Sequence, residues 1–175
     1  MSSAYRQRGF TYLLVLFFIA TVAAGLAAVG ELWSTSRQQE RERELLFAGN
    51  AIRQAIGAYY LATPGIVKQY PASLEHLLKD PRFPDTRRYL RRLYPDPVTD
   101  SPEWALIKAP QGGIMGIASA SERAPLKRAG FLDPNRAFEE QAVRLNDKLR
   151  YRDWEFNYEP VIRRTSDQGA GINSP

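Results

Sequence analysis

The distribution of proline divides this chain of 175 residues into two parts. All 12 prolines lie between Pro64 and Pro175, and the first 63 residues contain none. Because proline interrupts helices, only the first part can form one long unbroken helix. The sequence therefore predicts an N-terminal helical rod followed by a proline-rich compact body, which is enough chain for one domain plus an appendage.

The rod begins with a long uncharged segment. The 21 residues from Phe10 to Gly30 carry no charge. As a helix rising about 1.5 Å per residue, they span about 30 Å, the hydrocarbon thickness of a bilayer. Arg6 and Arg8 precede the segment, which predicts that its N-terminal end stays in the cytoplasm. An uncut signal anchor and a secretory signal cleaved at Ala28-Val29-Gly30 are both compatible with this pattern.

The second half of the rod is charged and then amphipathic. Residues 37–44 alternate bases and acids, and we expect them to form a solvated helix face. Apolar residues then recur at helical spacing on one side: Leu45, Ala48, Ile52, Ala55, Ile56 and Tyr59. This spacing predicts a helix face that covers the core of the body. Thr63-Pro64-Gly65 is expected to end the helix.

The body is predicted to combine short helices with antiparallel strands. Strands are expected at residues 104–109, 114–118 and 151–159, and helices at residues 73–78, 85–93 and 137–149, the last being a helix or an ordered loop. Gln111-Gly112-Gly113 is expected to join the first two strands as a hairpin. The tail from Arg163 to Pro175 is polar and is expected to be loose.

The junction at residues 6–11, Arg-Gln-Arg-Gly-Phe-Thr, resembles that of the type IV pilin and type II secretion pseudopilin family. In that family a short basic leader ends in glycine directly before Phe-Thr-Leu and an apolar helix. The resemblance implies that a prepilin peptidase cuts between Gly9 and Phe10, and that the new amino group of Phe10 is methylated. It also implies an α+β, pilin-like fold, in which a long N-terminal helix, its first half transmembrane, packs on a small antiparallel β-sheet domain.

The resemblance divides the chain into four parts. These are the leader (1–9), the transmembrane half of the long helix (10–30), its periplasmic half (31–63), and a globular α/β body with the loose tail (64–175). Within the body, Tyr70-Pro71 and Tyr94-Pro95-Asp96-Pro97, the latter before a strand led by tryptophan, look like the body of major-type pseudopilins.

The resemblance also implies a role, a location and partners. The chain would be a structural subunit of a type II secretion or type IV pilus-type machine. It would cross the bacterial inner membrane once, with its N-terminus cytoplasmic and its body periplasmic, and would assemble into a short periplasmic filament that aids protein secretion. Its partners would be the prepilin peptidase, other pseudopilin subunits, the inner-membrane assembly platform and membrane lipid.

The chain departs from the family at Leu14. The family usually has glutamate five residues after the cut, and this carboxylate pairs with the terminal ammonium of a neighbouring subunit. A charge without a partner is costly at low dielectric, so the substitution bears on assembly. In the family the missing glutamate is associated with a subunit at the filament tip, and it also fits a divergent, less filamentous relative.

The sequence carries no recognisable catalytic or cofactor motif. It has no cysteine and one histidine, His76, and it lacks a phosphate-binding loop, a Gly-x-Ser-x-Gly motif and a metal-spaced cluster. We therefore predict neither an enzyme nor a bound cofactor. Many relatives hold calcium in C-terminal loops, but Asp167 stands nearly alone there, so no metal is expected.

A basic cluster leaves two further functions open. Residues 64–98 contain seven bases against four acids, including Arg82, Arg87, Arg88, Arg91 and Arg92. We expect the four arginines of the predicted helix, Arg87, Arg88, Arg91 and Arg92, to be solvated or paired with acids of neighbouring subunits. Nucleic acid is therefore not the expected partner, although such a cluster also fits a DNA-contacting minor pilin of an uptake system. The other alternative is a membrane-anchored periplasmic domain with no filament role.

Overall fold

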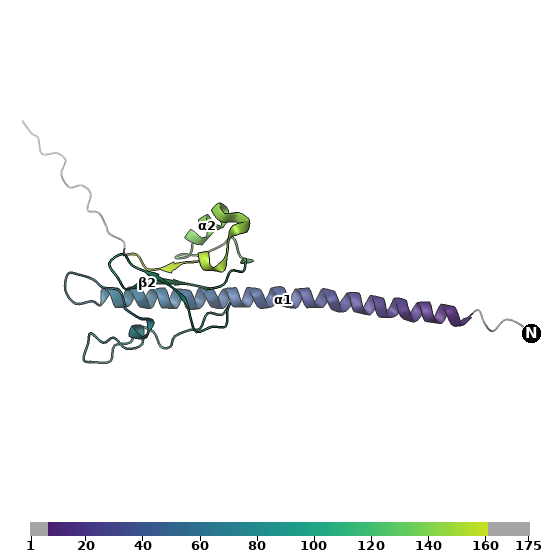
Figure 1. Cartoon of the computed structure of the whole chain (residues 1–175), viewed down its shortest axis with the longest axis horizontal. Coiled ribbons are helices and arrows are strands. Elements are labelled where there is room, and N and C mark those ends of the chain that lie inside the picture. The colour runs from purple at the N-terminus through teal and green to yellow at the C-terminus, as the bar shows by residue number, and fades with distance from the viewer. Residues whose placement is uncertain (1–6, 161–175) are drawn as a thin grey trace, which may run out of the picture.

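One helix runs through most of the length of the molecule. The computed structural model describes the backbone of residues 7–160 and the side chains of residues 11–23 and 33–160. Helix α1 (Gln7–Leu61) has 55 residues, which corresponds to about 80 Å. Its C-terminal half lies along the body, whereas its N-terminal half extends away from it (Figure 1). The helix ends just before Thr63-Pro64-Gly65, as predicted.

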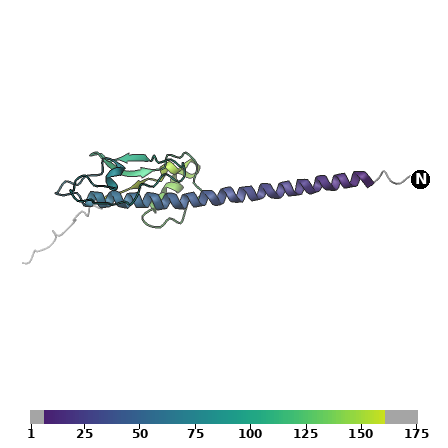
Figure 2. The same ribbon diagram turned by 90° about the horizontal axis from the view of Figure 1, so that it is seen from below.

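The body contains a three-stranded antiparallel sheet in the order β1-β2-β3. Strand β1 (Ala105–Lys108) pairs with β2 (Ile114–Ala118), and β2 pairs with β3 (Phe156–Asn157). The predicted hairpin is confirmed, because Gly112 and Gly113 form the turn with φ of 94° and 83°, a region that glycine enters readily. The sheet lies along one side of α1 (Figure 2).

The predicted apolar face of α1 is confirmed and forms one wall of the core. Its six residues are each at most 4% exposed: Leu45, Ala48, Ile52, Ala55, Ile56 and Tyr59. Burying a large apolar side chain stabilises a fold by about 1.5–3 kcal/mol. Phe156 of β3 is fully buried against the same helix, close to Gly49. The C-terminal half of α1 and the small antiparallel sheet thus share a single core.

Short helices complete the body. Helix η1 (Leu74–Leu77) follows Ser73, as predicted, although the Ser73 side chain makes no capping hydrogen bond. Within the predicted range 137–149 lie α2 (Ala137–Leu145) and the single turn η2 (Asn146–Lys148). Helix α2 buries Phe138 and Ala142.

The helix predicted at residues 85–93 is wrong, because this segment is irregular. Its backbone bonds to the segment before it rather than to its own turns. Tyr89 N and Leu90 N both donate to Leu77 O, at 2.9 and 3.0 Å, and Asp80 N donates to Arg87 O at 3.1 Å. The predicted sidedness nevertheless holds, since Leu90 is 7% exposed and Arg87 lies on the surface.

The strand predicted at residues 151–159 is mostly wrong. Its first part is the single turn η3 (Tyr151–Asp153), and only Phe156–Asn157 pairs with the sheet. An alternating strand would place Tyr151 and Trp154 on opposite faces. Both are buried, at 1% and 0% exposed, because a tight turn brings residues three apart to the same side.

Part of the predicted organisation lies outside the described residues. This applies to the side chains of the leader (1–9), to those of residues 24–30 within the expected transmembrane half, and to the tail 163–175. Among the residues that were searched, none of the helices is both long and apolar enough to cross a membrane.

Two glycines of α1 allow the packing of the helix on the body to be tested. A Cβ added at Gly49 would lie 2.6 Å from the buried ring of Phe156, and one at Gly57 would lie 2.6 Å from the half-buried ring of Tyr158. In a fragment of residues 37–175, we expect Gly49→Ala to lower the free energy of unfolding by about 1–3 kcal/mol, because the Phe156 ring cannot move aside. The matched control Gly57→Ala should cost much less.

Thermal or urea unfolding of the three proteins measures these differences. Alanine alone favours a helix over glycine by about 1 kcal/mol. A Gly49→Ala protein as stable as the parent, or more stable, would contradict the close packing of Phe156 on α1.

Candidate functional site

Residues 12–19, in the N-terminal half of α1, present apolar side chains on every side. Each of the eight consecutive residues from Tyr12 to Ile19 is a large apolar residue that is at least 45% exposed. Eight residues make more than two turns of helix, so this stretch has no polar face. Thr21, one turn further on, donates its hydroxyl to Phe17 O at 2.8 Å and satisfies it within the helix. Helices that are apolar on all sides are typically covered by lipid or by other protein elements.

The sequence-predicted processing residues lie at the start of this half. The backbone of Gly9 and Phe10 is in the first turns of α1, and their side chains are outside the described residues. Leu14 is 55% exposed within the apolar stretch.

The other half of α1 is joined to the body by buried polar contacts. The first is at Glu42, which we expected on a solvated face but which is only 4% exposed. Its Oε1 accepts hydrogen bonds from Tyr151 Oη at 2.8 Å and from Leu126 N at 2.5 Å. Its Oε2 accepts one from Lys127 N at 3.2 Å. Tertiary donors thus replace water around this carboxylate, and that expectation was wrong for Glu42.

Tyr151 is held in its donor form at this contact. Burial raises the pKa of its phenol, and the hydrogen bond and charge of Glu42 raise it further. Gln38 Nε2 also donates to Tyr151 Oη, at 2.8 Å. The phenol therefore stays protonated and bonded to α1 across the physiological pH range.

The second contact is at Arg53, which is 9% exposed. Its guanidinium donates to Asn135 Oδ1 at 2.9 Å and to Pro134 O at 3.3 Å, and it also contacts Asn50. Burial lowers the pKa of Arg53. These bonds fix the loop before α2 to the helix.

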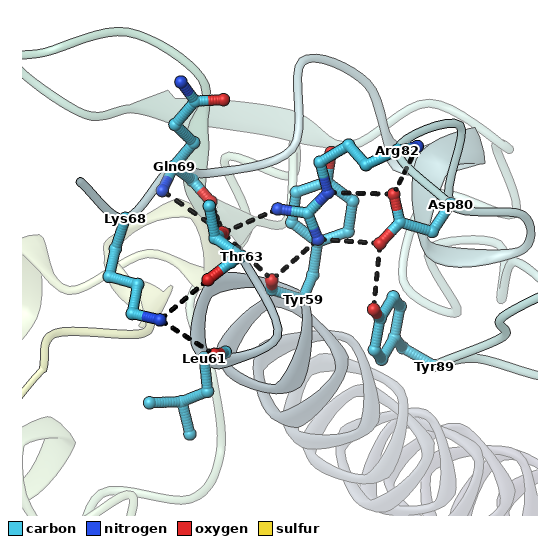
Figure 3. A network of polar contacts seen from close by, with 8 residues as sticks. All are labelled: Tyr59, Leu61, Thr63, Lys68, Gln69, Asp80, Arg82 and Tyr89. Atoms are coloured by element: carbon cyan, nitrogen blue, oxygen red, sulfur yellow. Dashed lines mark hydrogen bonds and ion pairs between the residues drawn. The ribbon is translucent and has the colours of Figure 1, made fainter. Parts of the chain in front are cut away.

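The third contact closes the C-terminal end of α1 (Figure 3). The guanidinium of Arg82 lies 3.6 Å from the centre of the Tyr59 ring. It donates to Tyr59 O at 2.9 Å and to Thr63 Oγ1 at 2.6 Å. Lys68 Nζ donates to Thr63 O at 2.7 Å and to Leu61 O at 3.3 Å. Two cations therefore satisfy carbonyls at the negative end of the helix dipole.

Asp80 orients Arg82 at this helix end. Its carboxylate, 1% exposed, accepts hydrogen bonds from Arg82 Nε at 2.9 Å, Arg82 Nη2 at 2.7 Å and Tyr89 Oη at 2.8 Å. Burial by itself would raise the pKa of Asp80, but the hydrogen bonds from Arg82 and Tyr89 outweigh it and lower the pKa to about 2. Arg82 therefore belongs to a largely buried ion pair and is separate from the exposed arginines that follow it in the sequence.

The remaining predicted residues separate into exposed and structural groups. Arg87, Arg88, Arg91 and Arg92 are exposed. His76 lies against Tyr59, with ring centres 6.4 Å apart. Among the described residues no group of three or more histidine, cysteine, aspartate or glutamate side chains could hold a metal ion.

One sequence signal could have identified the contacts near Glu42. Gln38 lies seven residues before Leu45, so the seven-residue repeat of the buried face already reaches into the charged stretch. Glu42 lies one turn before Leu45 on the same side. No comparable signal precedes the pair of Asp80 and Arg82, whose positions depend on the irregular segment after η1.

Comparisons of the chain with protein-family models, curated proteins and solved structures give no match. The features on which a function can be argued are therefore a long helix packed on a small antiparallel sheet, the exposed apolar stretch of that helix, and the residues of the N-terminal junction.

The Asp80–Arg82 pair should make the stability of the body depend on acid pH. Because the pKa of Asp80 is depressed to about 2 in the folded state, its stabilisation is complete above the ordinary value of 3.8 and is lost as the pH falls from about 4 to 2. In the fragment of residues 37–175, Asp80→Asn should reduce the free energy of unfolding at pH 6. This difference should shrink by about 2 kcal/mol at pH 2.

Urea unfolding at pH 2, 4 and 6 measures this dependence. The matched control is Asp100→Asn, since Asp100 pairs with Arg41 at 3.0 Å but its side chain is 72% exposed. The control should change little at any pH. An Asp80→Asn effect of equal size at pH 2 and pH 6 would contradict the role of the Asp80 carboxylate.

Proposed function

We propose that this chain is a structural, pseudopilin-like subunit of a type II secretion or type IV pilus-type machine. The observation that carries the proposal is the division of α1. Residues 12–19 are apolar on all sides and project away from the body, whereas residues 38–59 are fixed to it by a buried face and polar contacts. A helix with these two halves fits a protein whose body is attached to an apolar segment, and we call the part of α1 before residue 33 the stalk.

The apolar half is proposed to cross the bacterial inner membrane. Residues 10–30 are long enough for the hydrocarbon layer, with about 20 residues needed. Arg6 and Arg8 favour a cytoplasmic N-terminus, so the body is proposed to lie in the periplasm. The all-apolar surface of residues 12–19 supports this proposal, because lipid is one of the two environments that suit it.

Filament assembly would move the same helix from lipid into contact with helices of other subunits. Both environments are apolar, so packing and polar contacts rather than burial from water would drive the transfer. Leu14 offers no carboxylate to the ammonium of a cleaved neighbour. The chain is therefore proposed either to occupy the filament tip or to be held in the filament by contacts elsewhere.

Processing at the N-terminal junction tests this function. Cleavage after Gly9 should leave a mature chain of 166 residues that begins with methylated Phe10. Gly9→Val should block the cut, because a branched side chain obstructs the position before the scissile bond. Gly30→Val is the matched control and should be processed normally. Intact-mass analysis of the membrane-extracted proteins gives the N-terminal residue in each case.

The other possible termini identify the alternatives. An uncut Met1 in the parent protein would favour a plain membrane anchor. A mature protein that begins at Glu31 would indicate a secretory signal, and the stalk would then not exist in the mature chain. Either result contradicts the proposed function.

A further inference from the structure

The irregular segment 85–94 forms a basic surface whose backbone is fixed to the core. Its four arginines, Arg87, Arg88, Arg91 and Arg92, are exposed, and none forms an ion pair with the acids that the structure describes. The segment itself is held in place, because Leu90 is 7% exposed in the core and Tyr89 donates to Asp80. We call residues 85–94 the basic segment.

Two of these arginines are also oriented by aromatic rings. The guanidinium of Arg87 lies 3.9 Å from the centre of the Phe83 ring, and that of Arg92 lies 5.1 Å from the centre of the Tyr94 ring. A guanidinium stacked on a ring keeps its N–H edge available for acceptors and loses less conformational freedom on binding. The basic segment is therefore suited to carboxylate acceptors that are rigidly presented.

A groove of about 720 Å³ lies on the body, where α1, α2 and β3 meet. Its walls include the small residues Gly57 and Ala58 of α1 and the rings of Phe138 and Tyr158. The ring of Tyr158 lies directly over Gly57, whereas Ala58 and Leu61 of α1 are exposed. Together they provide an apolar surface for the methylene groups of a long side chain.

The groove carries carboxylates without a cationic partner among the described residues, although Glu155 Oε2 accepts a hydrogen bond from Asn157 Nδ2 at 3.0 Å. Glu155 and Glu159 are exposed at its edge, and neither forms an ion pair within residues 33–160. Gln141 Oε1 has no donor among the described residues. Arg53 is the one basic residue in the lining, and its guanidinium already bonds to the loop before α2. The groove is therefore complementary to a cationic side chain.

The basic segment and the groove lie on opposite sides of α1. Figure 1 shows α2 on one side of the helix and the blue-to-teal segment that follows α1 on the other. On α1 itself, the basic segment contacts Tyr59 and Phe47, whereas the groove is lined by Arg53 and Gly57. The two surfaces therefore do not meet within one copy of the chain.

We propose that two copies of this chain join body to body, with the basic segment of one copy in the groove of the next. Each copy offers both surfaces, so the contact is head-to-tail and can repeat along an open filament. The inference rests on the filament role proposed above and names the contact that would hold the bodies together. It would supply attraction that Leu14 does not provide between the stalks.

Cysteine cross-linking tests the contact cleanly, because the chain has no cysteine of its own. The full-length protein carrying both Arg91→Cys and Glu155→Cys is oxidised in membranes with copper phenanthroline. We expect a ladder of disulfide-linked dimers, trimers and larger species. Arg91→Cys or Glu155→Cys alone should stay monomeric, and the two single variants expressed together should give dimers only.

A matched pair controls for chance collisions. Lys108 is an exposed base on β1, outside the basic segment. Lys108→Cys combined with Glu155→Cys should give no ladder. An absence of cross-links in the Arg91–Glu155 pair would overturn the proposal, as would dimers from Arg91→Cys alone, which would indicate a symmetric contact.

Other occupants of the two surfaces give different results. If Arg163 and Arg164 of the same chain filled the groove, a ladder would form only after residues 161–175 were removed. If nucleic acid bridged the basic segments, nuclease treatment would abolish the cross-links. Either result would overturn the proposed contact.

The failure of this contact can be separated from failure of the proposed function. The mass of the N-terminus is measured on the same samples. If the chain is cut after Gly9 but gives no ladder, the proposed pseudopilin-like role stands and the proposed contact is overturned. If the chain is uncut but gives a ladder, the proposed contact stands and the pseudopilin-like role is contradicted.

Discussion

The burial of one face of α1 against β2 and β3 is the interaction on which the rest of the structure depends. The sheet is small, with a third strand of two residues, and cannot enclose a core by itself. The helix supplies the missing wall through Leu45, Ile52 and Ile56, each 0% exposed. The body therefore folds around part of a helix whose other part lies outside it, so the direction of the stalk is fixed by the packing of the core.

Polar contacts then fix where along the helix the body sits. Glu42 and Arg53 of α1, and Arg82 at the C-terminal end of α1, form buried or partly buried hydrogen bonds that a shifted helix could not make. Leaving a buried charge without its partners costs several kcal/mol, so these contacts select one position of the helix against the loops of the body. Apolar packing provides most of the stabilisation, and the polar contacts provide the specificity.

The sequence correctly predicted the elements in which residues close together in the chain share one buried face or one turn. The buried face of α1 and the β1–β2 hairpin follow from apolar spacing and paired glycines. Residue spacing failed to predict the conformation of segments whose hydrogen bonds or packing partners lie elsewhere in the chain. The pattern of apolar residues around Leu90 is compatible both with a helix and with an irregular segment that is hydrogen-bonded to Leu77. The alternation of aromatic residues after Tyr151 does not reveal the turn η3, which buries both Tyr151 and Trp154.

The candidate sites divide in the same way. The apolar stretch around Leu14 could be read from the sequence, because it depends on composition alone. The groove beside α2 could not, since its residues come from three separate elements. Gly9 and Phe10 remain predictions from the junction sequence, and their role depends on a peptidase rather than on the packing of this chain.

The central claim is that α1 is one continuous helix that carries the apolar stretch away from the body. Spin labels at Phe18→Cys and Gln54→Cys, both at exposed positions of α1, test it in the full-length protein by double electron–electron resonance. These positions are 36 residues apart, which is ten turns, so a continuous helix predicts a narrow distribution centred at about 54 Å. A broad distribution, or one centred at a much shorter distance, would show that the helix bends or breaks between the stalk and the body and would contradict the account.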